Sequence, residues 1–251
     1  MPLDIESIRR SRPANQLHYF GSVDSTMNVA GRLAAAGAPH GTAVFADEQT
    51  AGIGRLGRTW LSIADAGLYC SVLLRLKIAP VHLPLVTLVL GLATADAIQK
   101  TTALSCDLRW PNDVLIRERK AAGILAQLHE GCVVAGIGIN VNQRSFPKGL
   151  RTPATSLLIE SNGAAQSREA LAVQLLECLD VFGHLLETQG PESILRAFTA
   201  ASSYVLGRRV VIEENGREGV TAGLDAQGFL TVRFDSGAIE RVAAGGVRAT
   251  R

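Results

Sequence analysis

Residues 49–60 read QTAGIGRLGRTW and place three glycines and two arginines in one short segment. The segment is too short for a helix and too flexible for a strand. Glycine lets backbone N–H groups converge on an anion, since no side chain blocks the approach. Arg55 and Arg58 add guanidinium groups that can bridge phosphate or carboxylate oxygens. The segment therefore predicts an anion-binding loop.

Two common phosphate-binding patterns do not describe this loop. It lacks the Gly-Lys-Ser/Thr that ends a P-loop, and residues 55–60 do not read as the start of a helix, as a dinucleotide-binding fingerprint requires. A long surface loop with solvated arginines is the alternative. Trp60 favours an anion site, because a large aromatic at a loop's end usually anchors the loop or offers a surface for a base.

Three further segments follow in order: RWPNDVLI at 109–116, RKAAGILAQ at 119–127 and GIGINVN at 136–142. With the loop that Trp60 closes, they make the chain resemble the biotin protein ligases, also called biotin–acetyl-CoA-carboxylase ligases. The signature of that family is a Gly-Arg-rich loop ending in Trp, then Lys/Arg-Trp-Pro-Asn-Asp, Lys-x-x-Gly-Ile and Gly-x-Asn. The resemblance covers essentially the whole chain and is highly specific, because four spaced motifs agree.

The resemblance implies an ATP- and Mg²⁺-dependent ligase. In the family the biotin carboxylate attacks the α-phosphate of MgATP, which gives biotinyl-5′-AMP and pyrophosphate. A lysine amine on the carboxyl carrier domain of acetyl-CoA carboxylase, or of a related carboxylase, then attacks the mixed anhydride. Because carboxylate and polyphosphate are both negative, cations must lie between them.

The catalytic residues implied by the resemblance are Lys120, Arg55 and Arg58. Lys120 begins an apolar strand, where its ammonium can be partly desolvated; a strand-end lysine that reaches to solvent is the alternative. The biotin-binding residues that match the family are Ser25, Thr26, Gln49, Gly52, Gly54, Arg55, Lys120 and Gly123. The ATP-binding residues that match it are Arg55, Arg58, Trp60, Asn112, Asp113 and Asn140.

Several of these positions also have an ordinary structural interpretation. Ser25 and Thr26 could be helix caps, and one of them could have both roles. Asn112 could form an Asx turn, and Asn140 could cap the backbone at a strand end. Asp113 could bind Mg²⁺, which prefers oxygen ligands, or help to deprotonate the acceptor lysine. The sequence leaves these choices open.

The chain departs from the family pattern at two positions. The family commonly has Arg after the first glycine of the loop, where this chain has Ile53, and often Asn after Ser-Thr, where this chain has Met27. The first change removes one cation near the biotin carboxylate. We expect it to affect how tightly the adenylate is held, and not the class of reaction, because Lys120 and Arg55 remain.

Two other functions compete with this interpretation. A lipoate or octanoate ligase would also use a lysine and an adenylate, but the complete RWPND and GIGIN motifs argue against it. A nucleotide- or RNA-binding module would use the basic loop without catalysis. The C-terminal strands of this chain lack a row of aromatic residues interleaved with Lys and Arg, so recognition of RNA by stacking is poorly supported.

Composition and the N-terminus exclude further classes. A net charge of +2 does not by itself suggest nucleic acid, and residues 1–13 lack the apolar core of a signal peptide. The uncharged stretch 78–95 contains two prolines and predicts a buried helix, not a membrane span. The four cysteines lack zinc-site spacing and predict reduced thiols in a cytoplasmic protein. The Asp24-Ser25-Thr26 motif comes too early for a preceding winged helix-turn-helix, so we expect no DNA binding.

The elements that must position these residues follow an α/β pattern. Helices are predicted over residues 27–37, 84–100, 167–188 and 191–205. Strands are predicted over residues 41–49, 67–76, 107–116, 120–130 and 132–142. The last of these is nearly all apolar and therefore central. By resemblance, residues 1–202 form a mixed-sheet catalytic domain of the biotin/lipoate ligase type.

After residue 205 the pattern changes to short strands separated by turns. The turns are predicted at Asn215-Gly216, Gln227-Gly228 and Ser236-Gly237. Residues 203–251 therefore predict a small β-barrel, which resembles the SH3-like C-terminal domain of the family. Apolar edge strands would allow a homodimer.

Overall fold

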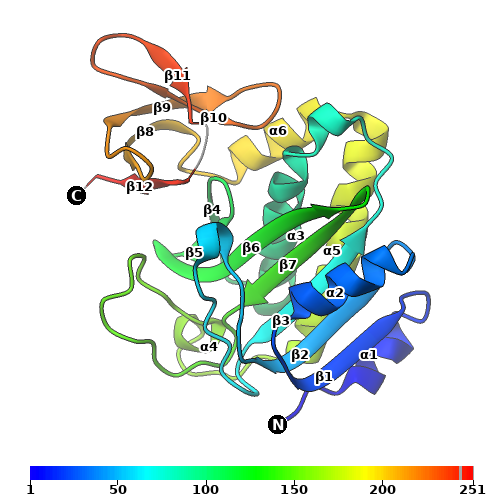
Figure 1. Ribbon diagram of the computed structural model, residues 1–251. Helices are drawn as coiled ribbons and strands as arrows, with labels where there is room; N and C mark the ends of the chain where they lie inside the picture. Colours follow the sequence, from blue (N-terminus) through cyan, green and yellow to red (C-terminus); the bar gives the residue numbers. More distant parts are fainter. Residues whose placement is uncertain (243–244, 251) are drawn as a thin grey trace.

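The computed structural model describes residues 1–242 and 245–250 (Figure 1). It contains a seven-stranded mixed sheet in the order β1-β2-β3-β7-β6-β5-β4 and a five-stranded antiparallel sheet in the order β11-β10-β9-β8-β12. All the helices of the described residues precede the second sheet in the sequence. The predicted fold class, a mixed-sheet α/β domain with a small C-terminal β-structure, is confirmed.

The first sheet contains all the strands predicted before residue 205. Its members are β1 (Leu17–Val23), β2 (Ala43–Gln49), β3 (Leu68–Leu74), β4 (Asp107–Arg109), β5 (Asp113–Ile116), β6 (Arg119–His129) and β7 (Cys132–Ile139). β1 runs parallel to β2, and every other pair is antiparallel. β7 is fully buried and lies in the middle, as its apolar sequence predicts. The turn predicted inside 107–116 separates β4 from β5.

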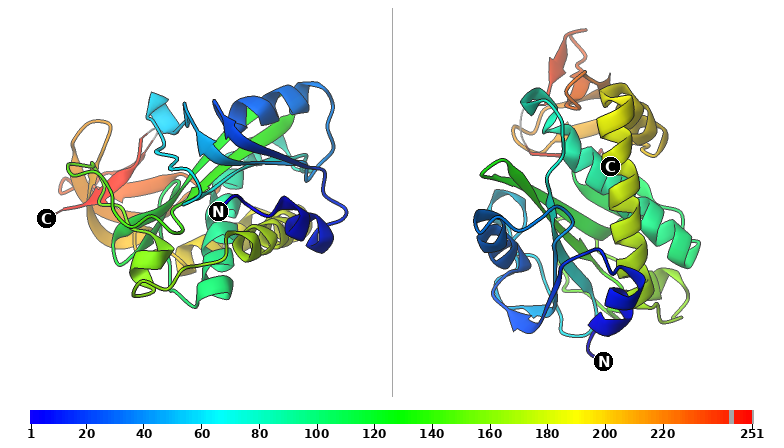
Figure 2. Two further views of the ribbon diagram at one scale, coloured as in Figure 1. Left: turned by 90° about the horizontal axis from the view of Figure 1, so that it is seen from below. Right: turned by 90° about the vertical axis from the view of Figure 1, so that its right-hand side faces the viewer.

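Six α-helices flank this sheet. They are α1 (Ile5–Ser11), α2 (Thr26–Ala35), α3 (Leu85–Thr102), α4 (Leu157–Glu160), α5 (Arg168–Gln189) and α6 (Pro191–Ala200). Figure 2 shows α2 on one side of the sheet and the long helices α3 and α5 on the other. Ser25 is the N-cap of α2, since its hydroxyl accepts a hydrogen bond from Met27 N.

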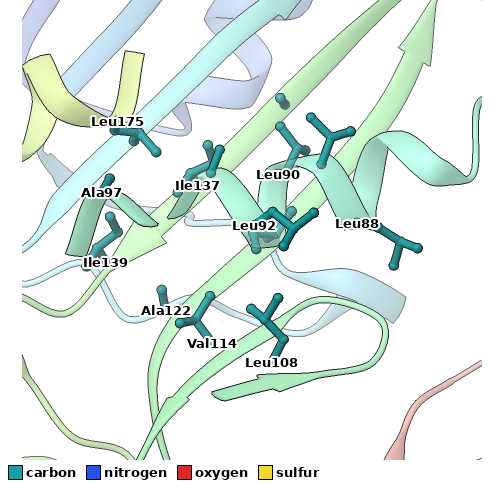
Figure 3. Packing of buried hydrophobic residues seen from close by; sticks show 14 of the residues in the cluster. Leu88, Leu90, Leu92, Ala97, Leu108, Val114, Ala122, Ile137, Ile139 and Leu175 are labelled. Atoms are coloured by element: carbon teal, nitrogen blue, oxygen red, sulfur yellow. The ribbon is translucent and has the colours of Figure 1, made fainter. Parts of the chain in front are cut away.

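The main core lies between the sheet and α3. Figure 3 shows Leu88, Leu90 and Leu92 of α3 above side chains of β4 to β7. Leu88 and Leu90 are almost fully buried, so each contributes about 1.5–3 kcal/mol from the apolar surface it removes from water. This face of the sheet is therefore a rigid support for whatever lies on the opposite face.

The opposite face of β7 changes character along the strand. Cys132 and Val134 pack against α2, because side chains on one face of a strand alternate with a period of two. The next two positions on that face, Gly136 and Gly138, have no side chains. No side chain of β7 therefore covers the sheet surface there, and the side chains of Met27 and Trp60 lie directly on the backbone.

The second sheet consists of β8 (Leu206–Ile212), β9 (Glu218–Leu224), β10 (Leu230–Arg233), β11 (Ile239–Arg241) and β12 (Val247–Ala249). The predicted turns at Asn215-Gly216, Gln227-Gly228 and Ser236-Gly237 fall between its strands, and all three glycines have positive φ. The Trp110 indole N–H donates to Gly228 O at 2.9 Å. This bond ties the second sheet to the β4–β5 hairpin.

The sequence analysis did not find two N-terminal elements, α1 and β1. β1 is an edge strand whose Gly21 and Ser22 are exposed, so it lacks an apolar repeat. Its neighbourhood is fixed by the buried ion pair between Arg168 and Asp47, at 2.8 Å. Such a long-range contact leaves no local signal in the sequence. Among residues 1–242 and 245–250, no helix has both the length and the apolarity needed to cross a bilayer.

Candidate active site

A cavity of about 260 Å³ lies on the α2 side of the sheet, between β6, β7, the 49–60 loop, residues 146–154 and the second sheet. All the predicted site residues line it except Ser25 and Gly52. Ser25 is fully buried as the cap of α2. Gly52 is a glycine for a local reason, because a Cβ there would lie 2.5 Å from Trp60 O.

The floor of the cavity is a pair of glycines that face each other. Gly123 of β6 is directly opposite Gly138 of β7, and the Trp60 indole covers both. A Cβ on Gly138 would lie 2.4 Å from the indole, and one on Gly123 would lie 2.7 Å from it. The indole Nε1 is buried and has no hydrogen-bond partner in the described part of the chain. It is therefore a donor that a ligand could use.

Charged side chains lie together at one end of this floor. Lys120 Nζ is 2.6 Å from Asp113 Oδ1, and Arg109 contacts the other carboxylate oxygen of Asp113. Arg109 also donates to Thr152 Oγ1 at 2.9 Å. Burial alone would raise the pKa of Asp113, but the adjacent Lys120 and Arg109 outweigh it and hold that pKa below its ordinary value. Asp113 is thus an anion that fixes two cations.

Lys120 points into the cavity and not into bulk solvent. Its ammonium lies 5.3 Å from the centroid of the Trp60 ring, within cation–π range. Its backbone is held on both sides, since its N–H donates to Pro153 O at 2.8 Å and its carbonyl accepts from Thr155 N at 3.0 Å. The ammonium is therefore positioned by a strand that cannot easily shift.

Asn140 and Asn112 support this arrangement from behind. Asn140 Nδ2 donates to the carbonyls of Lys120 at 3.3 Å and Thr155 at 3.0 Å. This is the backbone-capping role that the sequence analysis kept as the alternative for Asn140. Asn112 Nδ2 donates to Ile124 O at 3.0 Å, while its amide oxygen accepts from Arg55 at 3.0 Å. Asn112 therefore joins the β5–β6 hairpin to the glycine-rich loop.

The glycine-rich loop holds Arg55 and Arg58 at the mouth of the cavity. A short 3₁₀ turn, η1 (Arg55–Gly57), projects the two arginines, and Gly57 in it has a φ of +70°. Arg55 donates to Asn112 Oδ1 and to Gly245 O, both at 3.0 Å, and burial lowers its pKa from the ordinary value. Arginine stays charged at neutral pH all the same. Arg58 is half-exposed and 3.5 Å from Glu213.

The other end of the cavity holds a chain of neutral hydrogen-bonding groups. Gln49 Oε1 accepts from Thr26 N at 2.9 Å and from Thr26 Oγ1 at 3.0 Å. Gln49 Nε2 donates to Ser62 Oγ at 2.8 Å, and Ser71 Oγ donates to Thr26 Oγ1 at 2.8 Å. This end therefore suits an uncharged polar head group, whereas the Lys120 end suits anions.

Comparisons with known proteins agree with this geometry. The family model of the biotin/lipoate A/B protein ligases matches residues 19–143. The chain is 34% identical over 232 residues to the bifunctional ligase/repressor BirA of Bacillus spizizenii, covering 88% of this chain and 70% of that protein. It is also 34% identical to the biotin–[acetyl-CoA-carboxylase] ligase of Mycobacterium tuberculosis, covering 91% of this chain and 89% of that one. This chain is a member of the biotin protein ligase family.

Solved structures support the assignment. The biotin protein ligase of Aquifex aeolicus, in complex with biotin and ATP, superimposes with a TM-score of 0.81 at 33% identity, covering 94% of this chain and 99% of that one. The biotin protein ligase of Leishmania major, in complex with biotinyl-5-AMP, gives a TM-score of 0.67 at 25% identity and covers 91% of this chain. The present chain is therefore a biotin ligase enzyme.

The sequence analysis missed several residues that line the ligase cavity. Arg109 begins the RWPND motif, and its position in that motif could have identified it. Arg151 and Glu213 gave no signal, because each is a lone charge in a segment that reads as a solvated loop or strand end. Gly138 was found only as part of the GIGIN motif, although its pairing with Gly123 explains why both are glycines.

Asp113 was predicted either to bind Mg²⁺ or to help deprotonate the acceptor lysine, and its cationic surroundings do not favour the first of these roles. Each of its carboxylate oxygens contacts a cationic side chain, one from Lys120 and one from Arg109. Within residues 1–242 and 245–250, no three His, Cys, Asp or Glu side chains gather where they could hold a metal ion. Both carboxylate oxygens of Asp113 are thus engaged by side chains of the ligase itself.

The two departures from the family pattern, Met27 and Ile53, lie on one side of the cavity. The Met27 thioether rests on Gly136, where a Cβ would be 2.6 Å from its sulfur. Ile53 pairs with Thr59 across the loop and packs against the same apolar cluster as Met27. The side of the cavity formed by Met27 and Ile53 is therefore apolar in this ligase.

Proposed function

We propose that this ligase uses ATP to attach biotin, through biotinyl-5′-AMP, to a lysine of a biotin carboxyl carrier domain. The observation that carries the proposal is the placement of the Lys120 ammonium beside the glycine floor that Trp60 covers, between neutral hydrogen-bonding groups and two loop arginines. A relative from Mycobacterium tuberculosis is a biotin–[acetyl-CoA-carboxylase] ligase, and the similar Aquifex structure contains biotin and ATP.

The two ends of the cavity suit the two ends of biotin. Thr26 and Gln49 would bind the neutral ureido head through their hydroxyl and amide groups. The apolar tail would cross the glycine floor beside Trp60. Its carboxylate would then reach the Lys120 ammonium, which partly desolvated surroundings make strongly attractive to anions.

In the first step, a carboxylate oxygen of biotin would bond to the α-phosphorus of ATP. The bond between that phosphorus and the oxygen bridging to the β-phosphate would break, and pyrophosphate would leave with the electron pair. Lys120 and Arg55 would stand between the two anions and stabilise the charge that develops on the α-phosphate oxygens. Asn112 would keep Arg55 aimed at this point.

In the second step, the neutral acceptor amine, which has given its proton to solvent, would attack the acyl carbon of the adenylate. The bond between that carbon and the phosphate oxygen would break, AMP would leave with the electron pair, and the second amine proton would pass to solvent. The lowered pKa of Asp113, which follows from its two cationic neighbours, makes this carboxylate a weak base. We therefore assign Asp113 to holding Lys120 and Arg109 in place, and not to taking the proton of the acceptor amine.

The test is transfer of biotin to an isolated biotin carboxyl carrier domain, followed by intact-mass spectrometry. We expect a gain of one biotinyl group that requires both ATP and biotin, and no gain on a carrier whose acceptor lysine is replaced by Arg. Lys120→Ala should abolish most of the gain. Modification that proceeds equally well without ATP would refute the proposal.

A further inference from the structure

The direction of the Lys120 side chain depends on a β-bulge in the strand that carries it. Lys120 and Gly123 are three positions apart, so an unbroken strand would place them on opposite faces of the sheet. Lys120 Nζ nevertheless lies 3.0 Å from where a Cβ on Gly123 would be, and both residues line the cavity. The pairing of β6 with β5 gives the reason, since it leaves Ala121 as an extra residue between Lys120 and Ala122. Without the bulge, Lys120 would turn away from the cavity.

The hairpin between β5 and β6 turns through two residues in the left-handed region. Arg117 has a φ of +48° and Glu118 a φ of +62°, and Ile116 pairs with Arg119 beside them. Two-residue turns of this kind favour Asn-Gly or Asp-Gly, because larger side chains are strained there. A strained turn close to a bulge fixes the register of β6 weakly, so contacts from outside the hairpin must fix it. Arg208 of β8 supplies one such contact, to Glu118.

Glu160, the last residue of α4, supplies a second contact from outside the hairpin. Its side chain is fully buried. Its Oε1 accepts hydrogen bonds from Arg119 Nη2 at 2.7 Å and from Thr155 Oγ1 at 2.5 Å. Its Oε2 lies 3.5 Å from Arg117 Nη1. One buried carboxylate thus contacts the turn, the first residue of β6 and Thr155.

Thr155 links this acid to the backbone of Lys120. Its N–H donates to Lys120 O at 3.0 Å, and it is fully buried. Residues 153–155 lie outside the named strands and pair with β6 through a single bridge, between Ala154 and Lys120. The hydrogen bond from the Thr155 hydroxyl to Glu160 therefore gives this segment a further attachment, and Glu160 holds β6 from two directions at the bulge.

We propose that Glu160 is a positioning residue for adenylation. Its carboxylate fixes Arg119 and Thr155, and it thereby keeps the bulge that aims the Lys120 ammonium into the cavity. Glu160 does not itself line that cavity, so it acts through Lys120 and not on the substrates. This inference rests on the proposed function, because adenylation is the step in which Lys120 acts.

The first test compares the kinetics of three variants in biotin-dependent ATP–pyrophosphate exchange. Glu160→Gln keeps the shape of the side chain but removes the charge that holds Arg119. We expect kcat to fall about tenfold or more, because a small misplacement of a catalytic group is costly, with little change in the KM for ATP. Thr155→Val, which lacks the hydroxyl, should lower kcat in the same way. Thr155→Ser keeps the hydroxyl and should retain near-normal kcat.

The second test separates positioning of Lys120 from a general loss of stability. In the Lys120→Ala background, Glu160→Gln should cause no further loss in single-turnover formation of biotinyl-AMP, because no ammonium remains to be aimed. Urea unfolding should still show the loss of stability that Glu160→Gln causes. Glu240→Gln is the matched control, since it also removes a carboxylate from an arginine, Arg217 at 2.7 Å, but on β11. It should leave kcat unchanged.

Amide hydrogen exchange examines the same contacts without any substrate. The amides of Lys120 and Thr155 should exchange about tenfold faster or more in Glu160→Gln than in the wild type. Unchanged exchange of these amides would overturn the role of Glu160, and so would normal kcat in both folded Glu160→Gln and folded Thr155→Val. Losses that multiply in the double variant with Lys120→Ala would also overturn it, because they would show that Glu160 does not act through Lys120.

The outcomes for Glu160 and for the proposed function are distinguishable. A wild-type protein without biotin-dependent pyrophosphate exchange would refute adenylation, and amide exchange would still decide whether Glu160 holds the start of β6. Circular dichroism shows whether each variant is folded. If Glu160→Gln does not fold, the contrast between Thr155→Val and Thr155→Ser decides, since these two variants differ in the hydroxyl that reaches Glu160.

Discussion

The floor and the outer wall of the active site are built in different ways. On the floor, Lys120 and Asp113 are 2.6 Å apart, partly buried, and carried by paired strands of the central sheet. On the wall, Arg58 and Glu213 are 3.5 Å apart, and Arg58 is half-exposed on a loop. A short, partly buried pair contributes more than a longer pair with one half-exposed partner, since exposed ion pairs contribute only about 0–1 kcal/mol.

The rigid floor and the looser outer wall suit two different tasks in the active site. In the proposed mechanism the floor would keep the attacking carboxylate and the α-phosphate in one geometry, for which rigid elements are needed. The wall must let ATP and biotin enter and pyrophosphate and AMP leave, so loosely held arginines are suitable there. The predictions below disturb the floor first and the wall afterwards.

The largest effect is expected at Lys120. Lys120→Ala should lower biotin-dependent adenylation by at least about 100-fold, since a cation aimed at the reacting charge is removed. Asp113 keeps Arg109 as a partner, so the variant should still fold. Single-turnover formation of biotinyl-AMP is the measurement. Lys77→Ala, at an exposed position just after β3, is the control, and near-normal turnover in Lys120→Ala would refute the assignment.

The next effect tests the glycine floor. Gly138→Ala places a Cβ 2.4 Å from the Trp60 indole, so the ring must move. Overpacking of this kind costs about 1–3 kcal/mol of unfolding free energy, and adenylation should fall about tenfold or more because the ring is displaced. Urea unfolding and pyrophosphate exchange measure the two losses.

Gly21→Ala is the matched control for the floor, since a Cβ at this strand glycine meets nothing within 4 Å. The double variant Gly138→Ala/Trp60→Ala should lose less stability than the sum of the two single variants, because the clash disappears with the ring. Simple additivity would show that the indole does not lie on the floor.

A smaller effect is expected at the two arginines of the glycine-rich loop, Arg55 and Arg58. Arg55→Ala should speed the escape of biotinyl-AMP about tenfold, because Arg55 is fixed by Asn112 and Gly245 and its charge would face the adenylate phosphate in the proposed mechanism. Arg58→Ala should change this escape rate less. Release of labelled adenylate from the purified complex measures both, and equal rates for Arg55→Ala and the wild type would contradict the proposed anion-binding loop.

The smallest expected effect is on the pH dependence of the free energy of unfolding. Asp113 has a folded-state pKa below its ordinary value of 3.8, so the unfolded chain binds this proton more readily. The stability that Asp113 contributes is therefore complete above pH 3.8 and is lost as the pH falls through the folded-state pKa. In Lys120→Ala we expect the pKa of Asp113 to lie closer to 3.8. Asp113 then contributes less unfolding free energy that acidification can remove.

Urea unfolding of the wild type and of Lys120→Ala between pH 5 and pH 3 measures this effect. We expect the wild type to lose more unfolding free energy on acidification, because other carboxylates contribute alike to both proteins. Parallel losses would show that Lys120 does not hold Asp113 in its charged form.

Sequence alone predicted the floor better than the wall. Asn112, Lys120, Gly123 and Asn140 belong to short contiguous motifs on neighbouring strands, so locating the strands brought these residues together. The role of Asn140 became clear only from its bonds to Lys120 O and Thr155 O. The two roles left open for Asp113 did not include holding Arg109, because the sequence does not reveal that Arg109 folds back onto it.

The wall depends on contacts between distant segments. Arg58, Arg151 and Glu213 come from three regions with no shared motif, and nothing in their local sequence indicates that they meet. The same is true of β1, whose place at the edge of the sheet follows from pairing with β2 and not from its own apolar pattern. Tertiary packing decides such features, and local propensity does not.

The most direct test of the central claim is ATP–pyrophosphate exchange by the purified chain with Mg²⁺ in the buffer, run with biotin, with lipoate and with neither. The arrangement of Lys120, Arg55 and the neutral Thr26–Gln49 end predicts exchange that depends on biotin. Exchange with lipoate alone would contradict the assignment of the neutral end to a ureido group. Absence of exchange with either acid would contradict adenylation at this site.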